Sequence, residues 1–552
     1  MNRLAHVDDY PEIPVSLGST STALKTGAWR SVRPVRMERT APCAAACPAG
    51  VAIPAYLDHI RAGRLHEAQA EFASHNPFPH ITGRVCPHRC EQACNLGITT
   101  GDEPVSIRAI ERWLGDATAE LPHPTPNPDT GRRMAVVGSG PAGMAAAYYL
   151  RRTGHDVTVF ERRSRAGGML RHAIPEYRLP SHVVDGEIAR LQAMGITFLT
   201  GIELGADLTL DDLEATHAAV FVATGAWLER AAGIPGEHLL GSGLAFLEAV
   251  RRGEATLPGP RCAVVGGGNT ALDVARVLRR LGAEVTVLYR RTATEMPAIA
   301  EEYEAALAEG VDFEWLTLPR SVEKSGTGVV VTIEEARLGE PDGSGRRRPE
   351  PTGSTRRLEF DGLYTAIGET ADVGPIPARL RGGDGWPAVG SDGATPDPFV
   401  FAGGDLATGP ATVVAAIAAG RAAARAIDQR LGFGDRWPTE PPVEVVTPDE
   451  VHPAHRVHHA RAGESPSHAA DPLAEETSTI GDAEVLAEIE RCLSCGHCNA
   501  CGTCFVFCPD GAIRWEDGPV VDYEFCKGCG ICVAECPGHG LILVNEREAA
   551  HA

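Results

Sequence analysis

Two runs of four cysteines near the C-terminus share the spacing Cys-x2-Cys-x2-Cys-x3-Cys-Pro. Three closely spaced thiolates can hold three corners of a [4Fe-4S] cube, and the fourth cysteine of such a run ligates a second cube. A pair of zinc sites or a set of disulfides is the alternative, but zinc sites rarely carry this spacing twice. We therefore expect one cube on Cys498, Cys501, Cys504 and Cys536 and another on Cys526, Cys529, Cys532 and Cys508.

The spacing of these runs is that of bacterial ferredoxins with two clusters. Proline follows the fourth cysteine of each run, at Pro509 and Pro537. Electron transfer is therefore the predicted chemistry, and a ferredoxin-like α+β domain is expected at residues 486–552.

The composition limits the other classes of function. The chain has 552 residues, 43% of them hydrophobic, and a formal net charge of -22. This length predicts three or four domains, and the acidic charge argues against nucleic-acid binding, which needs a basic face. Sixteen cysteines and no recognisable signal peptide favour metal ligation in a reducing cytoplasm. The most apolar window, residues 411–427, contains Arg421 and is too short to span a bilayer.

A glycine motif in the middle of the chain is typical of dinucleotide binding. In Gly138-Ser-Gly140-Pro-Ala-Gly143 the first glycine permits a tight turn, the second lets the backbone approach a pyrophosphate, and the third lets helix and strand pack. Glu161, at the end of the next strand, can accept a hydrogen bond from a ribose hydroxyl. The expected elements are strands at residues 134–137 and 156–160 and a helix at 144–152. The candidate residues are Gly138, Gly140, Pro141, Ala142, Gly143, Glu161 and Gly168.

A second glycine motif lies between a strand expected at residues 262–265 and a helix expected at 272–281. The strand expected at 284–289 ends in two arginines instead of an acidic residue. Arginine suits a 2′-phosphate, so NADP is favoured over NAD, although these arginines could also be a solvated strand end. Cys262 lies within a strand and is expected in the core. The candidate residues are Gly266, Gly268, Asn269, Thr270, Ala271, Arg290 and Arg291.

Two shorter motifs complete the first fold. Thr224 and Gly225 follow a strand expected at residues 219–222, and Gly404 and Asp405 precede an apolar helix. A carboxylate in this place can hold the ribityl chain of a flavin. The predicted fold class is therefore α/β, with two nested Rossmann-like domains, a helical N-terminal iron–sulfur domain and the ferredoxin-like domain. The expected bounds are 1–128 for the N-terminal domain, 129–230 with 365–431 for the FAD domain, 231–364 for the NAD(P)H domain and 432–485 for an extended linker.

Taken in order, these motifs resemble the glutamate synthase small (beta) subunit family, whose flavin half is shared with dihydropyrimidine dehydrogenase. The matching text includes residues 167–180, with Arg178, then Tyr289-Arg-Arg, Glu295-Met-Pro, Ala366-Ile-Gly368 and Phe401-Ala-Gly-Gly-Asp405. The resemblance implies FAD in the first fold, NAD(P)H in the second, and hydride transfer between them. It also implies that the flavin passes single electrons to iron–sulfur clusters.

The N-terminal cysteines resemble the double-cluster domain of the same family. Cys43 and Cys47 are followed by Cys86, Cys90 and Cys94. One cluster in the family uses three cysteines and a polar side chain further along the chain, where this sequence has Glu111. The resemblance thus implies one ligand set of Cys47, Cys86, Cys90 and Glu111.

The chain departs from the family at the other N-terminal cluster, which needs a Cys-x2-Cys pair before Cys43. No cysteine precedes Cys43, but Arg491-Cys492-Leu-Ser-Cys495-Gly496 resembles the missing segment. We expect Cys492 and Cys495 to join Cys43 and Cys94 on a cube, because a linker of about 50 residues at ~3.3 Å each could cross any domain of this size. Four [4Fe-4S] clusters are then expected. The alternative is a single N-terminal cluster, with Cys492 and Cys495 as spare thiols.

These observations favour an electron-transfer subunit that works between NAD(P)H and iron–sulfur clusters through FAD. Its partner would be a catalytic subunit, such as a glutamate synthase large subunit or a 2-oxoacid:ferredoxin oxidoreductase, and flow in either direction is allowed. The alternative is a self-sufficient NAD(P)H:ferredoxin oxidoreductase, including one that bifurcates electrons. A redox-sensing module is disfavoured because both glycine motifs are intact. No catalytic acid or base is expected, because the cofactors carry the reaction.

Overall fold

The computed structural model describes residues 25–343, 345–383, 385–438, 444–453, 458–467, 470–516 and 518–549. The ends of the outermost predicted domains, residues 1–24 and 550–552, lie outside these ranges. The chain divides into two compact units. The first comprises the residues up to Leu121, Trp437–Ser465 and those from Thr479 onward, and the second comprises Pro122–Arg436 and Pro466–Ser478.

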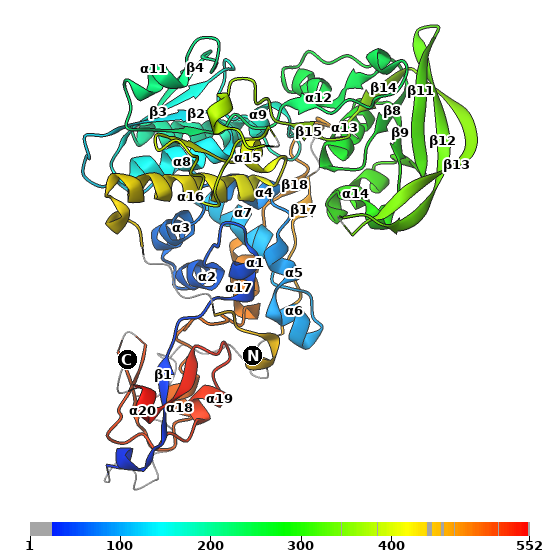
Figure 1. Cartoon of the computed structure of the whole chain (residues 1–552). Coiled ribbons are helices and arrows are strands. Elements are labelled where there is room, and N and C mark those ends of the chain that lie inside the picture. Colours follow the sequence, from blue (N-terminus) through cyan, green and yellow to red (C-terminus); the bar gives the residue numbers. More distant parts are fainter. Residues whose placement is uncertain are drawn as a thin grey trace. The chain divides into compact units, whose positions relative to one another are not determined.

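The first nucleotide fold of the second unit is a parallel sheet in the order β16-β5-β2-β3-β4. Strands β2, β3 and β4 of this sheet are labelled in Figure 1. Its strands from β2 to β5 come before the second fold in the sequence, and β16 comes after it, so the second fold is inserted into the first. Helix α16 packs along α8, where Gly420 allows close contact because a methyl group there would lie 2.2 Å from the carbonyl oxygen of Ala142. The elements are β2 (Arg133–Val137), α8 (Pro141–Arg152), β3 (Asp156–Glu161), α9 (Met169–His172), α10 (Ser181–Ala193), β4 (Thr197–Thr200), α11 (Leu210–Glu214), β5 (Ala219–Val222), β16 (Val400–Ala402), α15 (Asp405–Thr408) and α16 (Val413–Leu431).

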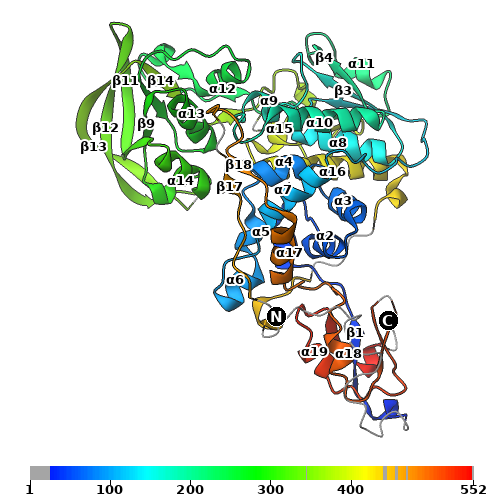
Figure 2. The same cartoon turned by 180° about the vertical axis from the view of Figure 1, so that it is seen from behind.

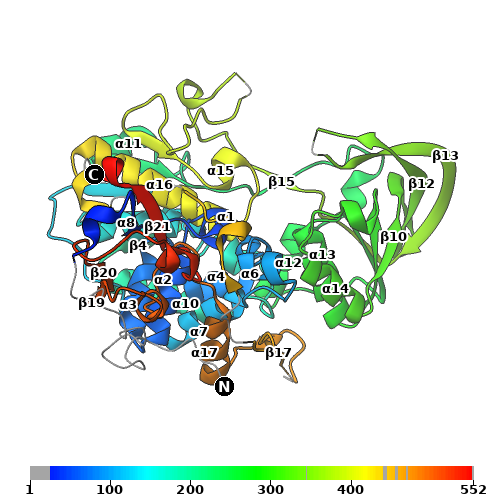
Figure 3. The same cartoon turned by 90° about the horizontal axis from the view of Figure 1, so that it is seen from below.

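The second nucleotide fold is a parallel sheet in the order β10-β9-β8-β14-β7. Helix α13 packs on one face in a core that includes Val264 and Val274. The antiparallel sheet β11-β12-β13 packs on the other face through Ala263, Leu288 and Val331. Figure 3 shows β12 and β13 on the opposite side of this fold from α13. The elements are β7 (Gly241–Ser242), α12 (Gly243–Arg251), β8 (Arg261–Val265), α13 (Asn269–Arg280), β9 (Glu284–Tyr289), α14 (Ala300–Ala308), β10 (Asp312–Trp315), β11 (Thr317–Ser325), β12 (Gly328–Pro341), β13 (Arg347–Phe360) and β14 (Gly362–Thr365).

Two short features join the parts of the second unit. An antiparallel ribbon of β6 (Leu228–Glu229) and β15 (Glu369–Thr370) connects the two nucleotide folds. In the strap, residues 466–478, the carboxylate of Glu476 accepts hydrogen bonds from Arg276 and Arg280 of α13 at 2.5 and 2.6 Å. The strap also contains β18 (Thr477–Ser478), which pairs with β17 (Ser465–Pro466). This part of the expected linker is therefore attached to α13.

The first unit contains a group of short helices. Helix α17, from the far end of the chain, packs against α2 and α7 of this group (Figure 2). It begins at Asp482, inside the range expected for the linker. The helices are α1 (Pro42–Ala46), α2 (Ile53–Arg61), α3 (Leu65–Ala73), α4 (Pro79–Val85), α5 (Arg89–Gln92), α6 (Asn95–Thr100), α7 (Ile107–Ala117) and α17 (Asp482–Arg491).

The ferredoxin-like part of the first unit includes a strand from the N-terminal region. Strand β1 pairs antiparallel with β21, with Arg36 opposite Leu541 and Val32 opposite Asn545. The Tyr523 hydroxyl donates to the carbonyl oxygen of Pro34 at 2.7 Å. The elements are β1 (Val32–Arg36), α18 (Thr503–Val506), β19 (Ile513–Trp515), β20 (Pro519–Val521), α19 (Ile531–Ala534), β21 (Leu541–Asn545) and α20 (Glu546–Ala549).

The expected strands of both nucleotide folds are present within one residue at each end. The two helices begin three residues earlier than expected, because the last residues of each glycine motif already form the first helical turn. Cys262 is fully buried in β8, as predicted. None of the helices in the described ranges is long and apolar enough to cross a membrane.

Candidate functional site

The first glycine motif forms a tight turn between β2 and α8. A methyl group at Gly138 would lie 2.3 Å from the carbonyl oxygen of Ala223, just after β5, and one at Gly143 would lie 1.9 Å from the carbonyl oxygen of Gly138. Around Gly140, in contrast, no atom beyond the glycine and its two chain neighbours lies within 4 Å of the position of an added methyl group. Gly140 is also the N-cap of α8, so the free N–H groups of that helix begin at this open space. The turn therefore fits a pyrophosphate.

Two carboxylates lie at strand ends near this turn. Glu161 accepts hydrogen bonds from the backbone N–H of Ser139 at 3.0 Å and of Arg163 at 2.8 Å. A carboxylate has about four acceptor positions, so capacity for a ribose hydroxyl remains. Asp405 accepts a hydrogen bond from the N–H of Ala411 at 3.1 Å. Burial, together with the charge of Glu369, raises the pKa of Asp405 to about 6.

The second glycine motif repeats this geometry. A methyl group at Gly266 would lie 2.2 Å from the carbonyl oxygen of Ala366, just after β14. Gly268 has no atom beyond its own residue and its two chain neighbours within 4 Å of the corresponding position, and it is the N-cap of α13. Asn269 accepts a hydrogen bond from the N–H of Ile299 at 2.9 Å. This turn fits a second dinucleotide by the same criteria.

The two arginines after β9 have different surroundings. Arg291 is 3% exposed and donates to Asp342 at 2.5 Å and to the carbonyl oxygen of Arg347 at 2.8 Å. Arg290 is exposed, and desolvation, followed by the charges of Arg291 and Arg346, lowers its pKa. Arg290 is therefore the more available partner for an anionic group.

The other candidate residues of the nucleotide folds lie close to these turns or between the folds. The side chain of Arg178 is 8% exposed and donates to Asp273 at 2.8 and 3.0 Å, and its Nε lies 2.8 Å from Glu302 of α14. Its side chain thus connects the segment before α10 to the second fold. A methyl group at Gly168 would lie 2.6 Å from the Cα of Gly140, while Thr224 and Gly225 come after β5 with one residue between them and the strand. The pKa of Glu369 is raised by burial, although a hydrogen bond to Thr270 opposes the shift.

Four of the predicted ligands line one cavity in the ferredoxin-like part, which we call the ferredoxin cavity. The cavity and its opening to solvent together enclose about 340 Å³, and Pro34 of β1 contributes to the wall. Burial, followed by the charges of Cys508, Cys526 and Cys529, raises the pKa of the Cys532 thiol to about 12. Of the cysteines that the structure describes, Cys529 alone is exposed. The cysteines of the ferredoxin cavity are Cys508, Cys526, Cys529 and Cys532.

The other set from the same two runs also comes together, and we call it the first ferredoxin set. The pKa of Cys504 is raised by burial and then by the charges of Cys501, Cys536 and Cys498, which places all four thiols near one another. Cys532 of the ferredoxin cavity raises the same pKa further. The two sets are therefore neighbours.

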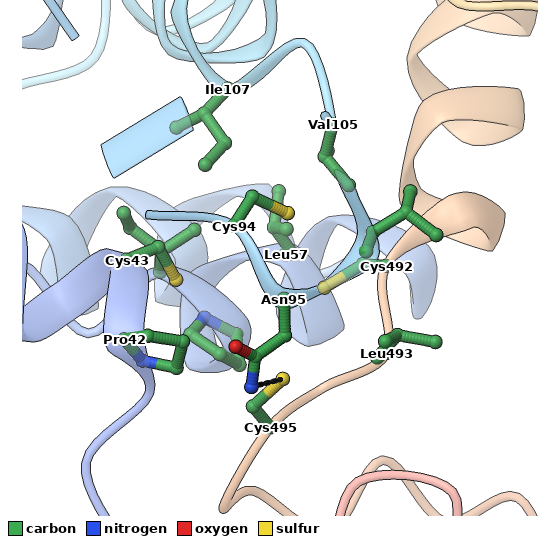
Figure 4. Close-up of a pocket in the computed structure, with 13 residues that line it drawn as sticks. Pro42, Cys43, Leu57, Cys94, Asn95, Val105, Ile107, Cys492, Leu493 and Cys495 are labelled. Atoms are coloured by element: carbon green, nitrogen blue, oxygen red, sulfur yellow. Dashed lines mark hydrogen bonds between the residues drawn. The ribbon is translucent and has the colours of Figure 1, made fainter. Parts of the chain in front are cut away.

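A second cavity, the composite cavity, is lined by cysteines from three separate segments (Figure 4). Its volume of about 350 Å³ is close to that of the ferredoxin cavity. The amide of Asn95 donates to the sulfur of Cys495 at 3.7 Å and to the carbonyl oxygen of Val446 at 3.2 Å. The pKa of Cys43 is raised by burial and by the charges of the other three thiols. The cysteines of the composite cavity are Cys43, Cys94, Cys492 and Cys495.

Buried charges at the end of α17 hold Cys492 in this place. Glu488 is 0% exposed and accepts hydrogen bonds from the N–H of Ser106 at 2.8 Å and of Ala462 at 2.6 Å. Arg491 is paired with Glu488 at 2.8 Å and donates to the carbonyl oxygens of Pro104 and Glu103 at 3.1 and 2.6 Å. Because Cys492 is the next residue, these contacts fix its position against the N-terminal helices.

The remaining candidates gather at what we call the three-cysteine site, formed by Cys47, Cys86, Cys90 and Glu111. The pKa of Cys86 is raised by burial, then by the charge of Glu111, and also by Cys47. Glu111 on α7 is 7% exposed, and one of its oxygens lies 3.3 Å from Nε2 of His88. Burial, followed by the charges of Glu111 and Cys43, raises the pKa of Cys90, so this site adjoins the composite cavity.

The chemistry of these donor sets fits iron–sulfur clusters. Buried thiols with mutually raised pKa values resist ionisation, and bound irons supply the positive charge that a thiolate needs there. Among the described residues, no three His, Cys, Asp or Glu side chains lie close enough to bind a single metal ion together. In a [4Fe-4S] cube each thiolate binds a different iron, so its ligands stand further apart.

Several residues near these sites carry no motif in the sequence. His88 faces Glu111, Asn95 donates to Cys495, and the Tyr56 hydroxyl is buried among the N-terminal candidates. Glu488 has an even less specific sequence signal, since a lone glutamate in a charged helix predicts an exposed side chain. Only the position of His88 two residues after Cys86 could have suggested a role.

Three family models match the chain. The model of the pyridine nucleotide-disulphide oxidoreductases matches residues 132–420. The model of dihydropyrimidine dehydrogenase domain II, a 4Fe-4S cluster domain, matches residues 17–122, and a 4Fe-4S binding domain matches residues 519–540. These matches confirm the predicted fold class and the predicted kinds of cofactor, namely FAD, a nicotinamide nucleotide and [4Fe-4S] clusters.

Curated relatives cover most of the chain. It is 38% identical over 441 residues to the NADP(+)-dependent formate dehydrogenase subunit beta of Moorella thermoacetica, covering 72% of this chain and 61% of that subunit. It is 36% identical over 509 residues to the NADPH-Fe(3+) oxidoreductase subunit beta of Geobacter sulfurreducens, with coverages of 83% and 75%. It is 36% identical over 415 residues to the glutamate synthase (NADPH) small chain of Escherichia coli, with coverages of 70% and 87%. The chain thus spans less than two thirds of the first of these relatives.

Proposed function

Because the chain belongs to the pyridine nucleotide-disulphide oxidoreductase family, in the group that includes the glutamate synthase small chain, we propose that it is an electron-transfer subunit. It passes electrons between NADPH and iron–sulfur clusters through FAD. The observation that carries this proposal is the gathering of cysteines from both ends of the chain at one cavity, in a protein with two dinucleotide folds.

FAD would be held by the first fold and NADPH by the second. The open turns at Gly140 and Gly268 each present helix N–H groups to a pyrophosphate. Glu161 and Asp405 supply acceptors for the ribose and ribityl hydroxyls, and Arg290 faces the 2′-phosphate. When bound, the two cofactors supply hydride transfer and the conversion of an electron pair into single electrons. The protein positions them and needs no acid or base of its own.

Four [4Fe-4S] clusters would occupy the three-cysteine site, the composite cavity, the first ferredoxin set and the ferredoxin cavity. Each site adjoins the next within the first unit. Cys90 neighbours Cys43, Cys495 is three residues from Cys498, and Cys504 is near Cys532. This order supports a relay from the three-cysteine site to the ferredoxin cavity.

The ferredoxin cavity would be the end of the relay that exchanges electrons with a partner. Cys529 is exposed, and beside it Ile531 is 37% exposed. Three relatives are named as a beta subunit or small chain of a larger enzyme, which supports a partner that is a separate catalytic subunit. The partner would be an oxidoreductase of the kind that accepts or donates single electrons.

The test is an anaerobic titration of the purified chain with NADPH, and separately with NADH, followed by visible spectroscopy. Bleaching of both the flavin bands and the broad iron–sulfur absorbance by NADPH is the expected result. A flavin that bleaches while the clusters stay oxidised would favour reverse flow or bifurcation. A protein that retains neither flavin nor iron would overturn the proposal.

Replacing Arg290 with serine tests the nucleotide assignment. Loss of a hydrogen bond to a charged group costs about 1.5–3 kcal/mol, which corresponds to a rise of about 10- to 100-fold in the KM for NADPH. The KM for NADH serves as the control and should stay unchanged. Equal rises for both nucleotides would show that Arg290 does not contact the 2′-phosphate.

A further inference from the structure

Tyr56 of α2 has a buried hydroxyl without a partner. The residue is 0% exposed, and its ring packs edge-on against Phe72 with the centroids 5.1 Å apart. Its hydroxyl has no hydrogen-bond partner among the described residues. An unsatisfied buried hydroxyl costs about 1–3 kcal/mol, so a partner outside the polypeptide is expected for it.

The groups around this hydroxyl belong to two of the proposed cluster sites. The pKa of Tyr56 is raised well above its usual value by burial and then by the charges of Glu111, Cys90, Cys43 and Cys492. The first two of these groups belong to the three-cysteine site, and the last two belong to the composite cavity. Tyr56 therefore stands where the two sites adjoin.

The position of α2 explains this placement. Three residues of the same helix, Ile53, Pro54 and Leu57, line the composite cavity. Tyr56 lies between Pro54 and Leu57 in the sequence but is absent from that lining, and its charged neighbours include Glu111 and Cys90. One helix thus forms an apolar wall for one site and presents a polar hydroxyl to the boundary with the other.

We propose that Tyr56 donates a hydrogen bond to a sulfur atom at the junction of the two N-terminal iron–sulfur clusters. A tyrosine hydroxyl is protonated at neutral pH and can donate, and thiolates and cluster sulfides accept. Hydrogen bonds to sulfur stabilise the more negative, reduced state of a cluster and so raise its reduction potential. Tyr56 would thus help to set the reduction potential of one of the two N-terminal clusters.

This inference rests on the proposed function, because it requires clusters at both N-terminal sites. Tyr56→Phe removes the hydroxyl and preserves the ring that packs on Phe72. The full-length variant would be purified anaerobically with its clusters, and its iron content and cluster potentials would be measured by chemical analysis and by an EPR-monitored redox titration. Tyr148→Phe is the matched control, since Tyr148 is fully buried in α8 of the second unit.

The expected result is a shift of one N-terminal cluster to a more negative potential in Tyr56→Phe, with unchanged iron content and unchanged ferredoxin-type clusters. Tyr148→Phe should shift no potential. Full iron content with all potentials unchanged would overturn the inference and leave the proposed function intact. Loss of iron from Tyr56→Phe would also overturn it, because it would assign Tyr56 a role in assembly. Absence of both N-terminal clusters from the unsubstituted protein would instead contradict the proposed function.

Discussion

The ferredoxin cavity and the composite cavity offer the same donor atoms in almost the same volume, about 340 and 350 Å³. They are assembled in different ways. The four cysteines of the ferredoxin cavity lie between positions 508 and 532, whereas those of the composite cavity range from position 43 to position 495. Local spacing is enough to define the first. The second depends on packing between segments from opposite ends of the chain. Substitutions that disturb this packing should therefore affect the composite cavity more than the ferredoxin cavity.

The largest expected effect follows from removing two ligands of the composite cavity. The double substitution Cys492→Ser and Cys495→Ser should lower the iron content by about four irons per chain, the content of one cube. Cys262→Ala, which removes a thiol buried in β8, is the control and should leave the iron content unchanged. An unchanged iron content in the double variant would show that Cys492 and Cys495 are spare thiols that bind no cluster.

A substitution that touches no cysteine should also disturb the composite cavity. Glu488→Gln leaves Arg491 buried without its counter-ion, and breaking such a pair costs about 3–5 kcal/mol. We expect a loss of that size in the free energy of unfolding, together with loss of iron from the composite cavity while the ferredoxin-type clusters remain. Chemical denaturation and EPR spectroscopy would measure the two effects.

The same helix provides the control for this substitution. Glu490 pairs with His459 at 2.9 Å, but both side chains are about one third exposed. Exposed pairs contribute only about 0–1 kcal/mol, so Glu490→Gln should change little. Equal effects of the two substitutions would show that α17 is not anchored through Glu488.

The ferredoxin cavity also depends on a segment far away in the sequence, the N-terminal region that contains β1. Substitution of Arg30 measures how strong this dependence is. Arg30 donates to both carboxylate oxygens of Glu546 at 2.8 Å. Arg30→Gln should destabilise the ferredoxin-like part by about 1–2 kcal/mol, since hydrogen bonds between charged groups are worth about 1.5–3 kcal/mol before exposure reduces them. The unfolding of this part can be followed through its cluster absorbance.

Lys25→Gln is the matched control for Arg30→Gln. Lys25 pairs with Glu524 at 2.8 Å, but both side chains are about two thirds exposed. No measurable change is expected from it. If Arg30→Gln also left the stability of the ferredoxin-like part unchanged, the pairing of β1 with β21 alone would account for the attachment of the N-terminal strand.

The contrast between the cavities also explains what could be predicted from the sequence. The glycine motifs and the two cysteine runs can be recognised in the sequence because the residues that act together lie within a few positions of one another. Cys492 and Cys495 were placed with Cys43 and Cys94 only through a family resemblance. Glu488 could not be assigned, because its partner Ser106 lies 382 residues away and nothing in the local pattern of α17 marks a buried charge. Tyr56 could not be assigned either, because nothing in the local pattern of α2 marks its hydroxyl as part of a site.

The smallest expected effect concerns the pH dependence of the segment that flanks the composite cavity. Arg39 donates to both carboxylate oxygens of Glu450 at 2.9 and 3.1 Å, and its backbone N–H donates to the carbonyl oxygen of Gly496, next to Cys495. The hydrogen bonds from Arg39, with smaller contributions from Thr447, lower the pKa of Glu450 to about 2. Nε2 of His539 lies 3.7 Å from the same carboxylate.

A carboxyl group whose pKa is lowered by folding stabilises the folded state above its unfolded pKa, and this contribution is lost as pH falls through its folded pKa. The contribution of Glu450 should therefore be complete above about pH 4.5 and should disappear between pH 4.5 and about 2. Glu450→Gln should remove this part of the pH dependence and leave stability at pH 2 close to that of the unsubstituted protein. Circular dichroism of the cluster-free protein would measure it without interference from acid-labile sulfide. Identical profiles for the two proteins would show that the ion pair with Glu450 is not needed to hold Arg39, whose side chain also lies 3.2 Å from Glu444. The composite cavity would then depend less on this charged anchor than the contrast with the ferredoxin cavity implies.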